Sequence, residues 1–387
     1  MQAFVNARII TPFEDIAQGT IIIEDQKIRE VGRSNKIAVP PNTKIYDGIN
    51  KIMCPGFIDI HVHGAKGHDF AEATPTAINQ IIDFHMAHGT TSFLPTLISM
   101  PEHDTVTALE QLPQAWSKTN FPSSFLGIHL EGPFLNPVYK GVHNSQALCL
   151  PSVEKIKTFF NHSAKTIKMI TLAPELPNSI KVIQWLKRQK VVISMGHSDA
   201  TYQQVKEAVQ NGLQHSTHTF NAMRGLHHRE PGALGAALNI KQISADIIID
   251  GWHIHPTMIQ ILCRQKEKKK VILITDAGSV CGLANGDYTL WGSKVRLDED
   301  KVSTLDSGKL AGSVMTMEQT IRNFKQFTQC SLTQAIQMAT YNPAALLGIE
   351  NQKGQLLPGN DADLVIMDKN FHITAVVTHG KIITIKT

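Results

Sequence analysis

The sequence has little of what marks secreted, membrane or disulfide-bonded proteins. Its 387 residues contain only five cysteines, which are far apart and form no C-x-x-C pair. We therefore expect a reducing compartment and no disulfide framework. No apolar run approaches the ~18 residues that span a bilayer, and the first residues show no basic segment followed by an apolar signal core. These features favour a cytoplasmic protein with no membrane partner.

Charge of one sign is also scarce. The chain has 37 basic and 33 acidic residues, a formal net charge of +4, and 42% hydrophobic residues. This balance favours a packed core over disorder. The densest basic cluster, residues 264–270, contains Glu267 and borders an apolar run, as a solvated helix end does. We therefore expect no nucleic-acid partner.

The two ends of the chain share a β-rich pattern. The first fifty residues alternate short β-branched runs with turn formers, and the pattern returns after the P-G-N-D sequence at residues 358–361. The length also exceeds the ~250–300 residues at which a single core stops growing. We predict one small β-sandwich domain from both termini, residues 1–53 and 356–387.

The middle of the chain, residues 54–355, alternates short apolar runs with longer segments of helical character. This alternation is typical of parallel βα units. Eight strand candidates suffice to close a TIM (β/α)8 barrel, so the predicted fold is α/β with this barrel as the catalytic domain. The predicted strands are residues 57–60, 91–94, 125–129, 168–172, 191–195, 215–218, 245–249 and 271–275.

Histidine and acidic residues lie at the ends of these strands. In a barrel, the C-terminal strand ends converge on one cavity, and imidazole with carboxylate is a ligand set for zinc or a similar divalent ion. Alternate residues of a strand share a face, so a His-x-His pair can direct both rings to one site. The candidates are His61, His63, Glu131, His197, His218 and Asp276.

Each candidate also has a plainer interpretation. Glu131 could be an exposed loop acid and His197 a hydrogen-bonded core histidine, while His215 competes with His218 in the same segment. We prefer His218 because it directly precedes a Thr-Phe-Asn sequence. Asp276 follows a buried apolar strand, where an unpaired charge is costly and partnership with a metal or its water is favoured.

Longer motifs resemble a known family. The sequence P-G-F-I-D-I-H-V-H-G at residues 55–64, Asp276 and P-G-N-D-A-D-L-V at 358–365 resemble the amidohydrolase superfamily. Further motifs, in order along nearly the whole chain, resemble its N-acetylglucosamine-6-phosphate deacetylases. They are H-L-E-G-P-F at 129–134, G-V-H-N at 141–144, G-H-S at 196–198, H-T-F-N-A-M at 218–223, R-E-P-G at 229–232, D-G-W-H at 250–253 and L-A-G-S at 310–313.

This resemblance implies metal-dependent hydrolysis of N-acetyl-D-glucosamine 6-phosphate to D-glucosamine 6-phosphate and acetate. Glu131, His197 and His218 would hold the metal, and Asp276 would be general base and acid. The resemblance also implies a homodimer in which one subunit's arginine serves its neighbour's site. The implied substrate-binding residues are His143, which would also stabilise the oxyanion, and Asn221, Ala222, Arg229, His253, Ala311 and Gly312.

The number and identity of the ions stay open at this stage. Some family members carry amide residues in place of the first-strand histidines and bind one metal, whereas His61 and His63 would allow a second, with Glu131 bridging. We therefore expect one or two divalent ions per subunit. Zinc is the first choice, and iron, cobalt and manganese are alternatives for such ligands.

Two rival functions remain. A cyclic amidase or a base deaminase would use the same barrel but would not need Arg229 and His253 as a phosphate pair. A catalytically silent scaffold is the other rival, because a fold does not establish activity. The sequence keeps all the candidate metal ligands and the candidate general base, which argues against a catalytically inactive protein. The chain has no G-x-S-x-G motif, so we expect no serine nucleophile.

Overall fold

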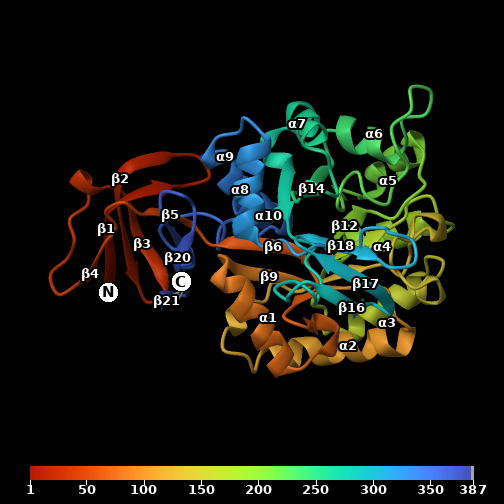
Figure 1. Ribbon diagram of the computed structural model, residues 1–387, viewed down its shortest axis with the longest axis horizontal. Helices are drawn as coiled ribbons and strands as arrows, with labels where there is room; N and C mark the ends of the chain where they lie inside the picture. Colours follow the sequence, from red (N-terminus) through yellow and green to blue (C-terminus); the bar gives the residue numbers. More distant parts are fainter. Residues whose placement is uncertain (385–387) are drawn as a thin grey trace. The chain divides into compact units, whose positions relative to one another are not determined.

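The computed structural model describes residues 1–384, and residues 385–387 lie outside it. Eight strands form one sheet in the order β15-β14-β13-β12-β11-β10-β9-β6, and every pairing from β9 to β15 is parallel. Figure 1 labels β6, β9, β12 and β14 of this sheet. The main-chain N–H of Asp276, after β15, donates to the carbonyl of His61 in β6 at 2.9 Å. The sheet is therefore nearly closed, and the predicted barrel is confirmed.

The barrel strands are short and apolar. All four residues of β12 and of β15 are buried, as expected for parallel strands covered on both faces. The predicted strand at 215–218 ends at Ser216, which leaves His218 beyond it. The predicted strand at 125–129 begins instead at Ile128, because Gly127 at φ 121° interrupts the extended run. The strands are β6 (Phe57–Val62), β9 (Thr90–Leu97), β10 (Ile128–Glu131), β11 (Ile167–Leu172), β12 (Val192–Met195), β13 (His215–Ser216), β14 (Ser244–Ile248) and β15 (Val271–Ile274).

Helices alternate with these strands along the chain, and their ends follow local chemistry. Thr201 and Ser331 each begin a helix with a capping box, in which the hydroxyl accepts from a main-chain N–H and a glutamine returns the contact. No helix among residues 1–384 is long and apolar enough to cross a bilayer. The helices are α1 (Pro75–Ala87), α2 (Glu102–Trp116), α3 (Val153–His162), α4 (Ser179–Arg188), α5 (Tyr202–Asn211), α6 (Gly232–Asn239), α7 (Pro256–Gln265), α8 (Met317–Phe327), α9 (Leu332–Ala339) and α10 (Tyr341–Leu347).

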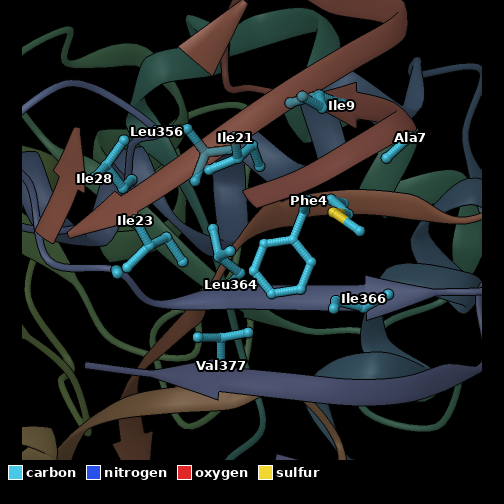
Figure 2. Close-up of a cluster of buried hydrophobic side chains, with 12 residues drawn as sticks. Phe4, Ala7, Ile9, Ile21, Ile23, Ile28, Leu356, Leu364, Ile366 and Val377 are labelled. Atoms are coloured by element: carbon cyan, nitrogen blue, oxygen red, sulfur yellow. The ribbon is translucent and has the colours of Figure 1, made fainter. Parts of the chain in front are cut away.

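Both ends of the chain build a second, mixed sheet. Strand β5 pairs in parallel with β1 and antiparallel with β19, so it joins the N-terminal strands to the C-terminal ones. Apolar side chains such as Phe4, Ile21 and Leu364 form its buried core (Figure 2). This sheet fits the predicted small sandwich. Its strands are β1 (Gln2–Ile10), β2 (Asp15–Glu24), β3 (Lys27–Arg33), β4 (Lys44–Asp47), β5 (Ile52–Pro55), β19 (Leu364–Met367), β20 (Ile373–Thr378) and β21 (Lys381–Thr384).

By compactness, the chain divides into two units. One comprises residues 60–84 and 93–315, and the other comprises residues 1–59, 85–92 and the chain from residue 316 onward. The domain limits predicted from the sequence, at residues 53 and 356, stay a prediction. The last three residues of the predicted C-terminal segment, 385–387, lie outside the described part.

A small antiparallel sheet that the sequence analysis did not identify follows β15. Its strands are β16 (Gly286–Leu290), β17 (Ser293–Asp298) and β18 (Lys301–Thr304). Trp291 at φ 50° and Gly292 at φ 83° connect β16 to β17, and two consecutive positive φ angles are typical of a tight hairpin turn. Buried Val295, Leu297 and Val302 anchor this sheet. A two-stranded ribbon, β7 (Gly64–Ala65) and β8 (His68–Asp69), follows β6.

Candidate active site

Ionisable side chains gather where the barrel strands end. His61 lies near the end of β6, Glu131 ends β10, and Asp276 lies two residues after β15. We call the whole group the strand-end cluster; it lies within one compact unit, and Asp276, 7% exposed, is its most exposed member. The cluster comprises His61, His63, Glu131, His143, His197, His218 and Asp276.

Glu131 joins the two halves of this cluster. Its Oε1 lies 3.2 Å from Nε2 of His197 and 3.2 Å from Nε2 of His218. These two ring nitrogens are themselves 3.0 Å apart. The other carboxylate oxygen, Oε2, lies 3.5 Å from Nε2 of His63 and 3.4 Å from Nε2 of His143. One carboxylate therefore faces imidazole nitrogens on both sides.

Asp276 faces the first-strand histidines. Its Oδ1 lies 3.3 Å from Nε2 of His61 and 3.3 Å from Nε2 of His63. The two ring nitrogens are 3.2 Å apart. The structure thus brings together all six predicted strand-end residues, together with His143.

The donor set fits one or two divalent ions. Two ligands about 2.0–2.1 Å from a tetrahedral zinc lie roughly 3.3–3.4 Å from each other. The separations within Glu131, His197 and His218 are 3.0 to 3.2 Å, and those within His61, His63 and Asp276 are 3.2 to 3.3 Å. Each trio therefore has nearly the spacing that a shared cation imposes. His143 also belongs to a potential ligand group, with Glu131 and His197.

The outer ring nitrogens fix which nitrogen can bind an ion. Nδ1 of His197 lies 2.8 Å from the carbonyl of Tyr139, and Nδ1 of His63 lies 3.1 Å from the carbonyl of Thr96. A carbonyl only accepts, so each Nδ1 carries the proton and each Nε2 keeps its lone pair for the cluster. His143 differs, because the main-chain N–H of Ser99 donates to its Nδ1 at 3.4 Å, which leaves the proton on Nε2.

The charges in the cluster favour ionised carboxylates. Burial opposes ionisation, but the imidazoles of His61 and His63 beside the carboxylate lower the pKa of Asp276 to about 2. Burial is likewise outweighed at Glu131, where His61 and His143 hold the pKa well below its usual range. Burial lowers the pKa of His143 to about 4, so this ring is neutral near pH 7. The site therefore holds two carboxylates in their charged form.

Three residues of the cluster have strained backbones. His197, His218 and Asp276 have φ angles of 49°, 30° and 52°, a region that costs about 1–3 kcal/mol for most residues and is common at functional sites. Contacts beneath the cluster hold this geometry. The carboxylate of Asp246 accepts from the main-chain N–H of His218, and its other oxygen lies 2.9 Å from Nε2 of His215. His215 therefore does not join the cluster but supports it.

A cavity of about 280 Å³ opens onto the cluster. Among the predicted substrate residues, His143, Asn221, Ala222, His253 and Gly312 line it. Ala311 is buried and does not line it, and Arg229 lies in an exposed loop and does not line it either. Of the two residues predicted to bind the phosphate, only His253 therefore lines the cavity in the described part of the chain.

The cavity also has residues that the sequence analysis missed. Trp291 and Lys309 line it, and they come from the three-stranded sheet and the segment after it. Asp246 lies within β14, where its sequence context shows only an acid in an apolar strand. Trp291 had no signal in the sequence, because its contacts depend on a hairpin that the apolar pattern did not reveal.

Comparisons with known proteins agree with this geometry. The Amidohydrolase family profile matches residues 52–383. The N-acetylglucosamine-6-phosphate deacetylase of Lysinibacillus sphaericus is 38% identical over 336 residues, which cover 87% of this chain and 86% of the relative. The N-acetylgalactosamine-6-phosphate deacetylase of Escherichia coli O157:H7 is 34% identical over 332 residues, covering 86% of this chain and 88% of the relative.

Solved structures show the same similarity. The N-acetylglucosamine-6-phosphate deacetylase of Pasteurella multocida has a TM-score of 0.93 at 28% identity and covers 99% of each chain. A mutant of the Mycobacterium smegmatis enzyme in complex with N-acetyl-D-glucosamine-6-phosphate has a TM-score of 0.90 at 28% identity and covers 98% of each chain. With the family profile and these relatives in agreement, the chain belongs to the amidohydrolase family.

Proposed function

We propose that the protein hydrolyses N-acetyl-D-glucosamine 6-phosphate to D-glucosamine 6-phosphate and acetate with a bound divalent ion. The observation that carries this proposal is the strand-end cluster, whose two ionised carboxylates and five imidazoles open onto a cavity that also contains Asn221 and His253. The similarity to deacetylases of this substrate class supports the same reaction.

Glu131, His197 and His218 are the proposed ligands of the first ion. His61 and His63 would hold a second ion, and Glu131 would serve as a ligand there as well. When bound, such an ion supplies Lewis acidity and lowers the pKa of a water. Zinc is our first choice, and iron, cobalt and manganese suit the same donors.

Asp276 is the proposed general base and acid. Its low pKa keeps it ionised near pH 7, so it can accept a proton from the attacking water. It then returns that proton to the departing amine nitrogen. The ring nitrogens of His61 and His63 each lie 3.3 Å from this carboxylate. His143 presents Nε2–H as a neutral donor, which suits stabilisation of the developing oxyanion.

The phosphorylated end of the sugar requires cations. His253 lines the cavity and its Nδ1 lies 2.5 Å from Asp250, which fixes the ring. Arg229, in the exposed loop, is proposed to reach the site of a second subunit in a homodimer, where its guanidinium can bind phosphate in bidentate fashion. Asn221, Ala222, Ala311 and Gly312 are proposed to contact the sugar. Cytoplasmic location stays a prediction from the sequence.

The test is amine release from three substrates by protein of known metal content. We expect turnover of N-acetylglucosamine 6-phosphate and at least about tenfold lower kcat/KM for unphosphorylated N-acetylglucosamine. N-acetylgalactosamine 6-phosphate belongs in the panel because one relative is named for it. Absence of turnover of all three by metal-loaded protein would overturn the proposal and direct the search to cyclic amides.

A further inference from the structure

Among residues 1–384, Lys309 is the only lysine or arginine that lines the cavity. It lies in the segment after β18, and the residue is exposed. No ion pair or hydrogen bond within the described part of the chain involves its ammonium group. The cavity therefore has a positive charge that no acidic side chain of the same chain neutralises.

Main-chain hydrogen bonds hold the segment that carries Lys309 beside the barrel. The carbonyl of Lys309 accepts from the main-chain N–H of Thr304 at 2.8 Å. Four residues later, the N–H of Ser313 donates to the carbonyl of Asp276 at 2.8 Å, and the carbonyl of Ser313 accepts from the N–H of Gly278 at 3.1 Å. Lys309 is therefore attached to a backbone that is fixed at both ends, next to the end of β15.

The neighbouring strand carries the proposed phosphate-binding histidine. Strand β14 pairs with β15 in the barrel, and His253, which also lines the cavity, follows β14. The indole N–H of Trp252 donates to Oδ1 of Asp300 at 2.9 Å, so the loop of His253 touches the turn between β17 and β18. Lys309 and His253 therefore lie on the same side of the cavity.

The depth of Lys309 indicates which end of the substrate it meets. The amide must reach Asp276 in the buried strand-end cluster, with which Lys309 forms no ion pair in the described part of the chain. The 2-acetamido group and the phosphate-bearing carbon are attached to opposite corners of the sugar ring, so the phosphate extends away from the cluster. A phosphate monoester carries a charge of about −1.5 to −2 near pH 7, which an exposed ammonium group complements.

We propose that Lys309 binds the substrate phosphate within its own subunit, beside His253, and strengthens the preference for phosphorylated over unphosphorylated sugars. This inference rests on the proposed deacetylase function. It requires no second subunit, in contrast to the contribution proposed for Arg229. Lys309 is thus a specificity-determining residue, with no part in proton transfer.

The test compares N-acetylglucosamine 6-phosphate with unphosphorylated N-acetylglucosamine in the native protein and in Lys309→Met. Loss of a hydrogen bond to a charged group is expected to lower kcat/KM for the phosphorylated sugar by about tenfold and to leave that for the unphosphorylated sugar within about twofold. A folding defect or a loss of metal would lower both values alike. The ratio of the two values therefore reports the phosphate contact.

A binding measurement gives a second readout that does not need turnover. We expect the Kd of D-glucosamine 6-phosphate, measured by calorimetry, to rise by about tenfold in Lys309→Met and to stay near the native value in Lys309→Arg. Lys294→Met is the matched control, because it removes the same charge from an exposed residue of the same small sheet that does not line the cavity.

Three outcomes would contradict these proposals in distinguishable ways. Native substrate ratio and native Kd in Lys309→Met, with both altered in Arg229→Met, would overturn the inference and assign the phosphate to the arginine alone. Equal effects of Lys309→Met and Lys294→Met would also overturn it, because net charge would then suffice. A native protein that neither hydrolyses nor binds these sugar phosphates would overturn the proposed function and the inference together.

Discussion

Each compact unit contains a cluster of Asp, Glu or His side chains, and the two clusters differ in how their negative charge is balanced. In the unit that holds the terminal sheet, Asp361, Asp363 and His379 lie close enough to form a metal-ligand group. Lys353 occupies that position: its Nζ lies 2.5 Å from Asp363 and 3.0 Å from Asp361. Lys27 adds a contact of 2.6 Å to Asp361. We call this group the lysine-filled cluster.

The strand-end cluster has no such built-in cation. Among residues 1–384, no lysine or arginine forms an ion pair with Glu131 or Asp276, and only imidazoles face them. Imidazole nitrogens that keep a lone pair are ligands, whereas an ammonium group is not. The comparison therefore separates a structural ion network from a site suited to a metal, although both use the same residue types.

The largest effect is expected for Asp276→Asn, which keeps the shape of the side chain and removes its charge. Loss of the general base lowers kcat/KM for N-acetylglucosamine 6-phosphate by about 10²–10⁴-fold. The measurement is amine release with metal content determined on the same sample. A variant that keeps its ion and loses less than about tenfold in rate would contradict the role of Asp276.

Lys353→Met tests the other cluster. Lys353 is only 7% exposed, and removing one partner of a buried pair costs about 3–5 kcal/mol. We expect the free energy of unfolding, measured in urea, to fall by that amount. The metal content is expected to stay unchanged. Lys27→Met is the matched control, because the Lys27 side chain is 50% exposed and such a pair contributes about 0–1 kcal/mol. Loss of metal from Lys353→Met would erase the distinction between the clusters.

Asp246→Asn tests whether the contacts that hold the proposed metal ligands in place matter for metal binding. Asp246 holds the main chain of His218 and the ring of His215, and partners of this kind contribute about 10–100-fold to metal affinity. We expect the metal affinity of Asp246→Asn to fall by about 10–100-fold, measured by competition titration with a chelator. Asp287→Asn, which alters an exposed ion pair with Arg296, is the control. Equal affinity in Asp246→Asn and the native protein would show that this support is unnecessary.

The smallest effect concerns pH. Burial opposes charge in the lysine-filled cluster, but the Lys27 hydrogen bond and the Lys353 charge lower the pKa of Asp361, and the charge of Asp363 raises that of Lys353. The contribution of Asp361 to stability is complete above about pH 4 and is lost as pH falls through its folded pKa. The contribution of Lys353 to stability is complete below about pH 10.4 and is lost as the pH rises further.

The Tm difference between native protein and Lys353→Met measures this dependence. We expect a constant difference between about pH 4 and pH 10 that shrinks at both extremes. A difference that keeps its full size in strong acid and alkali would mean that Lys353 acts through packing alone.

Part of this site could be predicted from the sequence because barrel geometry is regular. Any polar residue just after an apolar parallel strand reaches the same cavity, so Glu131, His197 and Asp276 could be placed without coordinates. The terminal sheet was predictable for a similar reason, since both ends of the chain carry the same short β-branched runs.

The remaining features depend on contacts between distant segments. Trp291 lies in a turn whose partners, Asp69 and His63, are more than two hundred residues earlier in the chain. Asp246 resembles any acid in a strand until its contacts with His215 and His218 are seen. Arg229 lies outside the cavity of its own chain, so its role depends on a subunit contact that neither a sequence pattern nor a single chain contains.

The most direct test of the central claim is a titration of chelator-treated protein with zinc, in which acetate release from N-acetylglucosamine 6-phosphate and bound ion are measured together. If the strand-end cluster is the catalytic metal site, turnover rises in proportion to bound zinc and saturates at one or two ions per chain. Glu131→Ala then binds no stoichiometric ion and shows no turnover, while Lys353→Met follows the native curve. Full turnover before any ion is bound, or ion binding without turnover, would contradict the account.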